Sequence, residues 1–221
     1  MTVQGDEATT RPRRGLMEKR EAVVRGALTV FARDGYTRGS IGEIAKEAGV
    51  STRTIYNHFA DKDAVFRTVI TESTTRVRTA HLAIIDRYLG RVTDIEADLR
   101  AFTRRFATSS RDFPEHFALM RQIQAEVGHL PPEVLEAWQD AGPRRVNQAL
   151  ADRLAELAEQ GLLELTDPRR AAMHLVSLTA SEITAKTFQG ALPMPDEDVD
   201  TIVDAGLEVF LRAYRPRDVQ G

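Results

Sequence analysis

The sequence contains no cysteine in its 221 residues. This absence excludes disulfide bonds, thiol redox sensing and cysteine-bound zinc. The chain also lacks the run of about 18 apolar residues that a membrane-spanning helix would need, and its start carries charges rather than the apolar core of a signal peptide. We therefore expect a cytoplasmic protein with no membrane partner.

Motifs that carry enzymatic chemistry are missing as well. The sequence has no nucleophile elbow, no glycine-rich loop that would cradle a phosphate, and no His-Glu-x-x-His run. Glu126 and His129 have the Glu-x-x-His spacing of a di-metal bundle, but such a site needs that pair twice and two further carboxylates. We therefore predict no enzyme, no metal site and no cofactor. A helical enzyme would require a convergent titratable cluster that the sequence does not display.

Alternating patterns typical of β-strands are absent, and apolar residues recur at helical spacing along the chain. The sequence therefore predicts an all-α protein. The expected helices, separated by glycine and proline breaks, span residues 16–34, 40–48, 51–59, 61–89, 93–109, 115–127, 132–140, 142–160, 168–189 and 196–214.

Charge is distributed unevenly, although the net charge is only −3. Residues 1–62 hold 11 Lys and Arg against 8 Asp and Glu, a net charge of +3, and residues 63–221 hold 19 against 25, a net charge of −6. This asymmetry favours a phosphate-binding role for the first third of the chain.

The stretch from Ser40 to Phe59 has the pattern of two short helices joined by a tight turn. Ser40 and Glu43 can form a capping box at the first helix, and Gly49 can end it, because only glycine enters the left-handed region without a steric penalty. Ile55 and Phe59 would form the inward face of the second helix. This arrangement predicts a helix-turn-helix, whose second helix enters a DNA major groove.

The outward face of that second helix is dense in hydrogen-bonding groups. Arg53 could bind guanine edges and Asn57 adenine edges, each with two hydrogen bonds, while Tyr56 and His58 suit phosphate oxygens. Lys62, at the start of the following helix, could also meet a phosphate. The alternative is an ordinary helical hairpin with a solvated polar face. The predicted DNA-binding residues are Ser40, Thr52, Arg53, Thr54, Tyr56, Asn57, His58 and Lys62.

These residues resemble the DNA-binding domain of the tetracycline-repressor (TetR) family. The resemblance rests on residues 31–36, 41–45, 48–51, 54–59 and 61–63, and it covers roughly residues 20–69. It implies DNA contacts by the residues that match Thr52, Arg53, Thr54, Tyr56, Asn57, His58 and Lys62. Gly42 stands where some members place an arginine that reaches a base. The second half of the chain is similar to the AefR-like branch of the family.

We expect three parts in the chain. Residues 1–15 would form a disordered basic arm, residues 16–62 the helix-turn-helix domain, and residues 63–221 an effector-binding and dimerisation domain. The arm contains Arg11, Arg13 and Arg14, which could enter a minor groove or lie along phosphates. The alternative is a solubilising tail.

The last two expected helices are apolar over a wide arc, which implies burial on two sides. One side can be the body of the chain and the other a second copy, which would give a two-fold four-helix interface. An internal helix pair is the alternative, and the resemblance favours the homodimer. The predicted interface residues are Leu175, Thr179, Ile183, Ile202, Val203 and Phe210.

Aromatic residues and methionines of the body could line a mostly apolar pocket. Core packing is the alternative for each of them, but the resemblance implies a small-molecule effector for the domain as a whole. The predicted pocket residues are Phe102, Phe106, Phe117, Met120, Ile123, Trp138, Met173 and His174. Together these patterns indicate a dimeric, ligand-responsive repressor of a near-palindromic DNA operator. The other possibility is a helical small-molecule-binding protein that has lost DNA affinity.

Overall fold

The computed structural model describes residues 10–216, and for residues 10–14 it describes only the course of the backbone. Within this range the chain is helical and contains no strand. The helices are α1 (Thr10–Arg38), α2 (Ile41–Ala48), α3 (Thr52–Tyr56), α4 (Lys62–Leu89), α5 (Ile95–Ala107), α6 (Pro114–Ala125), α7 (Pro132–Ala141), α8 (Pro143–Glu159), α9 (Pro168–Lys186) and α10 (Asp196–Tyr214), with short 3₁₀ turns at Ser109–Arg111 and Val127–His129. The predicted all-α fold is confirmed.

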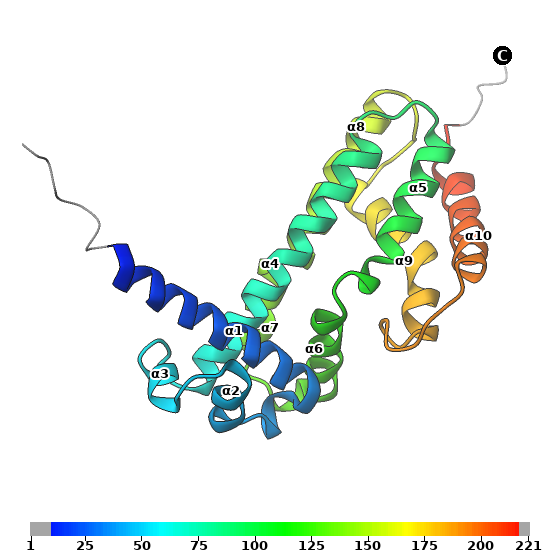
Figure 1. The fold of residues 1–221 in the computed structure, drawn as a ribbon. Coiled ribbons are helices and arrows are strands. Elements are labelled where there is room, and N and C mark those ends of the chain that lie inside the picture. Colours follow the sequence, from blue (N-terminus) through cyan, green and yellow to red (C-terminus); the bar gives the residue numbers. More distant parts are fainter. Residues whose placement is uncertain (1–9, 217–221) are drawn as a thin grey trace, which may run out of the picture.

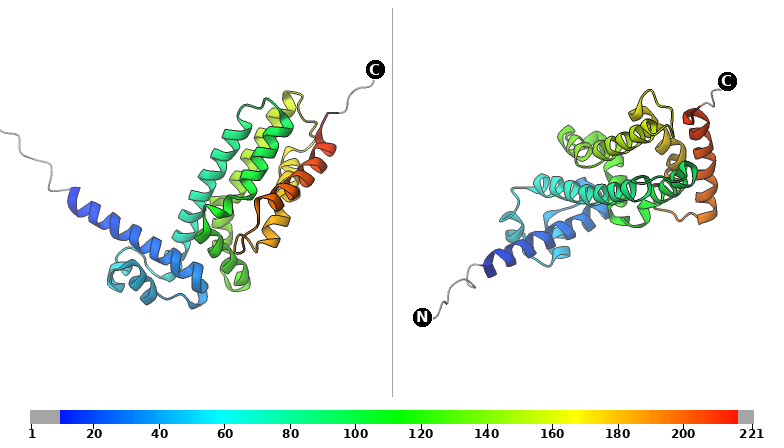
Figure 2. Two further views of the ribbon diagram at one scale, coloured as in Figure 1. Left: turned by 45° about the vertical axis from the view of Figure 1, so that its right-hand side comes forward. Right: turned by 90° about the horizontal axis from the view of Figure 1, so that it is seen from above.

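Helices α1, α2 and α3 form a head at one end of the molecule, and α4 runs from this head to the far end of the helical body (Figure 1). Helix α4 begins after Asp61, whose Oδ1 accepts a hydrogen bond from the amide of Ala64 at 2.7 Å. It ends before Gly90, as the sequence predicts. Figure 2 shows that the N-terminal end of α1 projects away from the body. The long α4 therefore connects head and body as one continuous element.

Helix α1 differs from the prediction at its start. It begins at Thr10 rather than Leu16, so residues 10–15 of the predicted disordered arm are helical. Residues 1–9 and the side chains of Arg11, Arg13 and Arg14 lie outside the described residues, and a DNA contact by this arm stays a prediction. The regular helix is interrupted at Gly35, as predicted, where φ is 79°.

One hydrophobic cluster spans the predicted boundary between head and body. It joins Phe31 and Ile44 of the head to Phe66 of α4 and to Leu119 and Ile123 of α6. A second cluster occupies the other end of the body, between the C-terminal half of α4 and helices α5, α8, α9 and α10. The head therefore shares its core with α6 and the start of α4.

No helix within residues 10–216 combines the length and apolar character that a membrane crossing requires.

Candidate nucleic-acid interface and ligand pocket

The capping box at the start of α2 forms as predicted. The Ser40 Oγ accepts a hydrogen bond from the Glu43 amide at 3.2 Å, and the Glu43 carboxylate accepts one from the Ser40 amide at 3.0 Å. At the other end, Gly49 adopts φ 64° and ψ 32°, the left-handed conformation of a helix C-cap. Both ends of α2 are thus fixed by local hydrogen bonds, and this fixes where α3 begins.

Helix α3 is shorter than predicted but keeps its predicted faces. It covers Thr52–Tyr56, and the turn that follows continues the helical hydrogen bonds, with the Phe59 amide donating to the Ile55 carbonyl at 2.9 Å. Ile55 and Phe59 are buried against the head core. The Ser51 Oγ caps the helix by accepting from the Thr54 amide at 3.1 Å. The opposite face is therefore held outward by a rigid frame.

Most of the predicted DNA-binding side chains lie on that outward face. Thr52, Arg53 and Asn57 are exposed, and Tyr56 is 57% exposed despite its large ring. Within the described residues, the Arg53 guanidinium makes no hydrogen bond or ion pair. Thr54 is half-buried and hydrogen-bonds with the Ser51 hydroxyl at 2.9 Å. The structure thus brings together an exposed polar row with an unpaired cation at its centre.

His58 differs from its exposed neighbours because it is half-buried. Its Nε2 is covered by protein and has no hydrogen-bond partner within the described residues, and its ring lies 6.4 Å from that of Phe59. A phosphate contact by His58 would therefore use Nδ1.

Lys62 is also half-buried. Its ammonium is held by the turn from Gly35 to Ser40, which joins the regular part of α1 to α2 and is called the α1–α2 turn below. The Nζ donates hydrogen bonds to the carbonyl oxygens of Tyr36 at 2.9 Å and Gly39 at 3.2 Å, and it lies 4.4 Å from the centroid of the Tyr36 ring. The Tyr36 hydroxyl donates to Asp63, and burial together with this carboxylate raises the pKa of Tyr36 to about 12. Lys62 therefore stabilises the turn before α2, and only its third hydrogen stays available to a phosphate.

Glu126, which the sequence pairs with His129 at metal-ligand spacing, contacts backbone amides instead. Its carboxylate accepts hydrogen bonds from the amides of Tyr36 at 2.9 Å and Thr37 at 3.2 Å. Among the described residues, no three His, Cys, Asp or Glu side chains are grouped so as to hold a metal ion. Glu126 thus connects the end of α6 to the turn that precedes α2.

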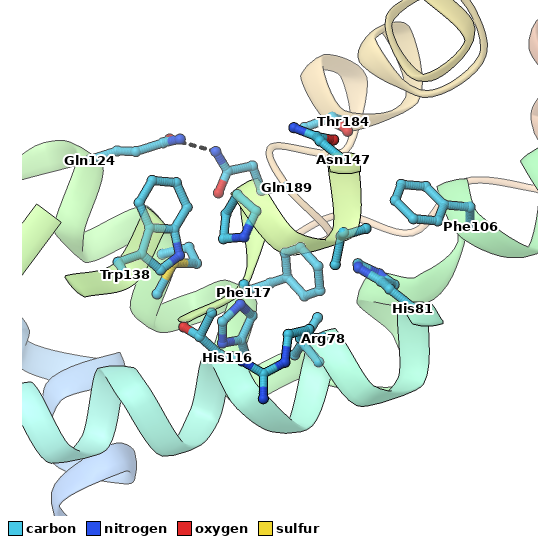
Figure 3. A pocket seen from close by; sticks show the side chains of 16 residues that line it. Arg78, His81, Phe106, His116, Phe117, Gln124, Trp138, Asn147, Thr184 and Gln189 are labelled. Atoms are coloured by element: carbon cyan, nitrogen blue, oxygen red, sulfur yellow. Dashed lines mark hydrogen bonds between the residues drawn. The ribbon is translucent and has the colours of Figure 1, made fainter. Parts of the chain in front are cut away.

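A cavity of about 290 Å³ lies in the body, lined by residues of α4, α6, α7 and α8 and by others from α5, α9 and the turn after α9 (Figure 3). Four predicted pocket residues line it: Phe106, Phe117, Met120 and Trp138. The other lining residues are Thr74, Val77, Arg78, His81, His116, Gln124, Gly142, Pro143, Val146, Asn147, Thr184 and Gln189.

The other four predicted pocket residues do not line this cavity. Phe102 is buried in the second hydrophobic cluster, and Ile123 packs into the core shared with the head. Met173 and His174 lie on the exposed face of α9, where His174 Nδ1 hydrogen-bonds with the Tyr214 hydroxyl at 2.7 Å. Their apolar or aromatic character was the basis of the prediction, but helix orientation decides which side chains reach the cavity.

Polar lining residues were missed by the prediction. Polar side chains on an amphipathic helix are ordinarily assigned to the solvent face. On α4, however, Thr74, Val77, Arg78 and His81 follow the i, i+3, i+4, i+7 spacing of one helical face, and all four line the cavity. That mixed stripe is the sequence signal that could have found them.

Both histidines in the cavity wall are held neutral at neutral pH. Burial, with a smaller contribution from positive neighbours, lowers the pKa of His81 and of His116 to about 4. Each also hydrogen-bonds with a serine hydroxyl at 2.9 Å, His81 Nε2 with Ser109 and His116 Nδ1 with Ser73. They therefore act as flat, neutral walls with hydrogen-bonding capacity.

The six predicted interface residues are all buried within the single chain. Leu175, Thr179 and Ile183 of α9 pack inward, as do the predicted residues of α10, which are Ile202, Val203 and Phe210. Little of their surface is therefore left for a partner chain. The same helices expose other apolar residues: Met173, Leu178 and Val209 are 54%, 37% and 51% exposed. These side chains give the outer face of α9 and α10 an apolar character.

The pair α2 and α3, with the polar face of α3 exposed, defines a helix-turn-helix protein. Residues 23–69 match the profile of bacterial regulatory proteins of the tetR family, and residues 97–216 match the AefR-like transcriptional repressor C-terminal domain. The chain belongs to the TetR family of transcriptional regulators, which are not enzymes.

Solved structures agree with this assignment over most of the chain. A putative TetR-family regulator from Mesorhizobium loti is 27% identical with a TM-score of 0.81, covering 91% of this chain and 98% of that one. The flavonoid-responsive regulator FrrA is 30% identical with a TM-score of 0.66, covering 90% of this chain and 98% of that one.

A curated relative matches over a shorter stretch. The HTH-type transcriptional regulator AcrR of Shigella flexneri is 45% identical over 49 residues, which is 22% of this chain. The matched stretch spans only 23% of the length of AcrR.

Proposed function

We propose that this regulator binds a near-palindromic operator as a homodimer in the cytoplasm, represses transcription there, and is released when a small, mostly apolar effector occupies the 290 Å³ cavity. The observation that carries the proposal is the double role of α6. One part of its surface lines the cavity, through His116, Phe117, Met120 and Gln124, and another part contacts α1 and the turn after it.

Polar contacts add to the apolar core that α6 shares with α1, and they run from Glu115 to Glu126. The Thr29 hydroxyl donates to Glu115 at 3.2 Å, and the Gln122 side-chain amide donates to the Arg33 carbonyl at 3.4 Å. At the end of α6, Glu126 accepts from the amides that precede α2. A ligand that moves α6 would therefore move the head. The continuous α4, which also lines the cavity, offers a second connection.

Release requires that the effector bind one arrangement of the two heads better than the other. A ligand shifts such an equilibrium only by its differential affinity for the two states, typically about 1–3 kcal/mol of coupling. Within a dimer, a small rotation of α4 and α6 in each subunit would change the spacing of the two α3 helices. A fixed operator spacing would then no longer fit both heads.

The aromatic walls of the cavity favour an aromatic effector. Phe106, Phe117 and Trp138 line it, and the ring of His81 lies 4.4 Å from that of Phe106. The related regulator FrrA, at 30% identity, is flavonoid-responsive, and flavonoids are aromatic compounds, which supports an aromatic effector for this cavity.

DNA selection followed by compound screening tests this proposal. Sequences bound by the full chain are enriched from random DNA, and fluorescence anisotropy then measures their affinity with and without candidate compounds. We expect tight DNA binding that an effector weakens by about 5- to 150-fold. A double variant, Arg53→Ala with Asn57→Ala, should lose sequence preference while it still binds the effector. If no DNA sequence is enriched but compounds bind, the chain is a small-molecule-binding protein without DNA affinity, and the proposal is wrong.

A further inference from the structure

The cavity wall carries positive charge and no negative charge. Among its sixteen lining residues are one arginine and two histidines, and neither aspartate nor glutamate. Because both histidines are neutral, Arg78 supplies the full charge of the wall. A cationic effector would meet this guanidinium with no carboxylate to compensate, so the wall disfavours cations.

Arg78 also lacks the carboxylate partner that some arginines of the body have, Arg104 and Arg144 among them. Its Nη1 donates to the Ala141 carbonyl at 2.5 Å, and within the described residues no carboxylate lies within ion-pair distance. By contrast, Arg104 lies 2.5 Å from Asp200, and Arg144 lies 2.7 Å from Asp140. A guanidinium has five N–H donors, and within the described residues only the Arg78 Nη1 has a hydrogen-bond acceptor.

Thr74 provides a second unpartnered group one helical turn before Arg78. It lines the same cavity and is 3% exposed, and its Oγ1 is buried with no hydrogen-bond partner within the described residues. Leaving a buried hydroxyl unpaired costs free energy, and a ligand that pairs it recovers that cost. Because residues at i and i+4 lie on one face of a helix, Thr74 and Arg78 can serve the same ligand group.

We propose that the effector is an aromatic monocarboxylate, whose carboxylate accepts hydrogen bonds from Arg78 and Thr74 and whose ring system packs between Phe117, Met120 and Trp138. This inference rests on the proposed function, because it concerns the effector of the same cavity. The size also follows from the cavity: about 150 Å³ of closed apolar space holds benzene, so about twice that volume suits a bicyclic body. The carboxylate distinguishes the effector from a neutral aromatic compound of the same shape.

Isothermal titration calorimetry on the full-length protein tests whether the cavity prefers an anionic ligand. The three probes are similar in shape: naphthoate, naphthamide and naphthylmethylammonium, substituted at the same ring carbon. We expect naphthoate to bind about 10- to 100-fold more tightly than naphthamide, because hydrogen bonds to a charged group are the stronger ones. The ammonium compound should not bind measurably. Equal affinity for acid and amide, preference for the cation, or failure of all three to bind would overturn the inference.

Variants identify the two anchoring residues. Arg78→Met, which keeps an apolar stem, should weaken naphthoate binding about 10- to 100-fold and leave naphthamide within about threefold. Thr74→Val should weaken naphthoate about fivefold without lowering thermal stability, because it removes an unpaired hydroxyl and keeps the shape. Arg76→Met is the matched control, since Arg76 is exposed on the same helix and does not line this cavity. If Arg78→Met binds naphthoate as the unaltered protein does, Arg78 is not the anchor and the inference is wrong.

Anisotropy with the selected DNA separates this inference from the proposed function. Binding of naphthoate without any change in DNA affinity would contradict the regulatory function and leave the ligand class standing. Release of DNA by naphthamide in preference to naphthoate would contradict the ligand class and leave the regulatory function standing.

Discussion

Arg53 is exposed on α3 with no partner among the described residues, and this combination has a direct consequence for recognition. A free guanidinium on a helix held by Ile55 and Phe59 can make two hydrogen bonds to a guanine edge without breaking any contact in the free protein. Arg53→Ala should therefore cost about 1–3 kcal/mol in binding to the selected DNA and relax base preference at one position of each half-site. Anisotropy titrations against single-base variants of that DNA measure both effects.

Lys62→Ala is the matched control, because a phosphate contact carries no sequence information. It should weaken binding to all sequences alike and reduce the slope of log affinity against log salt by about one. The substitution should also destabilise the α1–α2 turn in the free protein, because the Lys62 ammonium is bound by two carbonyl oxygens of that turn. If both variants changed affinity and base preference in the same way, the separate roles of the two residues would be refuted.

His116 makes stability depend on pH. Its pKa falls from its ordinary value of 6.5 to about 4 in the folded chain, mainly because burial disfavours the charged ring. The unfolded chain therefore binds a proton below pH 6.5 that the folded chain does not, and stability present above pH 6.5 is lost as the pH falls toward 4. We expect His116 to account for a loss of about 2 kcal/mol at pH 5.

Urea unfolding between pH 7 and pH 5 measures this loss. His116→Asn should flatten the pH dependence, whatever its effect on stability at pH 7, and His81, whose pKa is shifted in the same direction, should supply the part that is left. His129→Asn, at an exposed histidine, is the control for the substitution itself. An unchanged slope in His116→Asn would contradict the buried, neutral state of that ring.

Among the elements, the turn between α1 and α2 depends most strictly on one residue. Gly35 adopts φ 79° and ψ 178°, a conformation essentially restricted to glycine, and a Cβ there would lie 2.6 Å from the Glu126 carboxylate. Gly35→Ala should therefore destabilise the chain by about 1–3 kcal/mol and disturb the contact between α6 and the head. Gly49→Ala, with φ 64° and open space around it, should cost less, about 1–2 kcal/mol.

Chemical denaturation of the two variants beside Gly128→Ala provides the comparison. Gly128 has neither a positive φ nor an atom within 4 Å of an added Cβ, so its variant should stay within about 0.5 kcal/mol of the unaltered protein. Equal stability of Gly35→Ala and Gly128→Ala would show that the turn tolerates a side chain, contrary to its conformation in the structure.

Local signals explain which elements were predictable from the sequence. The cap of α4 at Asp61, the capping box of α2 and the break at Gly35 depend on neighbouring residues, and all three occur where the sequence places them. The end of α3 does not follow from such signals, because no glycine or proline marks it and the His58 amide bonds to the Ile55 carbonyl three residues before it. The sequence therefore predicted the starts of α2 and α4 and the break at Gly35 better than it predicted the end of α3.

The spacing of apolar residues in the sequence predicts how much of a helix surface is buried, but not whether the same chain or a second copy covers it. The wide apolar arcs of α9 and α10 do indicate burial on two sides, yet much of the covering comes from α5 and α8 of the same chain, which reach Leu175 and Phe210. The prediction of the pocket residues has the same limitation. Phe102 and Phe106 are one turn apart on α5, and of the two only Phe106 lines the cavity. Tertiary packing, which the sequence of a single helix does not specify, decides whether an apolar side chain lies in the core, in the cavity wall or at an interface.

At the scale of the whole molecule, the proposed dimer depends on the outer face of α9 and α10. Val209→Arg should raise the dimer dissociation constant about 100-fold, because it places a charge where two chains would exclude water. Sedimentation at micromolar concentration should then show folded single chains. Leu175→Arg should instead prevent folding, because that side chain is fully buried within one chain.

Val127→Arg is the control for the dimer, since Val127 is exposed to the same degree as Val209 but lies in the turn after α6, outside α9 and α10. Its variant should sediment as the unaltered protein does. A folded Val209→Arg dimer of unchanged affinity would place the interface elsewhere on the chain.

Two exposed α3 helices, held at a fixed spacing by a pair of chains, are the centre of this account. The most direct measurement is the DNA sequence that the full-length protein enriches from a random pool, together with its footprint. We predict two inverted half-sites, protected on one face of the duplex, in which Arg53→Ala relaxes the same base position on both sides. Enrichment of a single, unrepeated site bound by one chain, or no enrichment at all, would contradict the account.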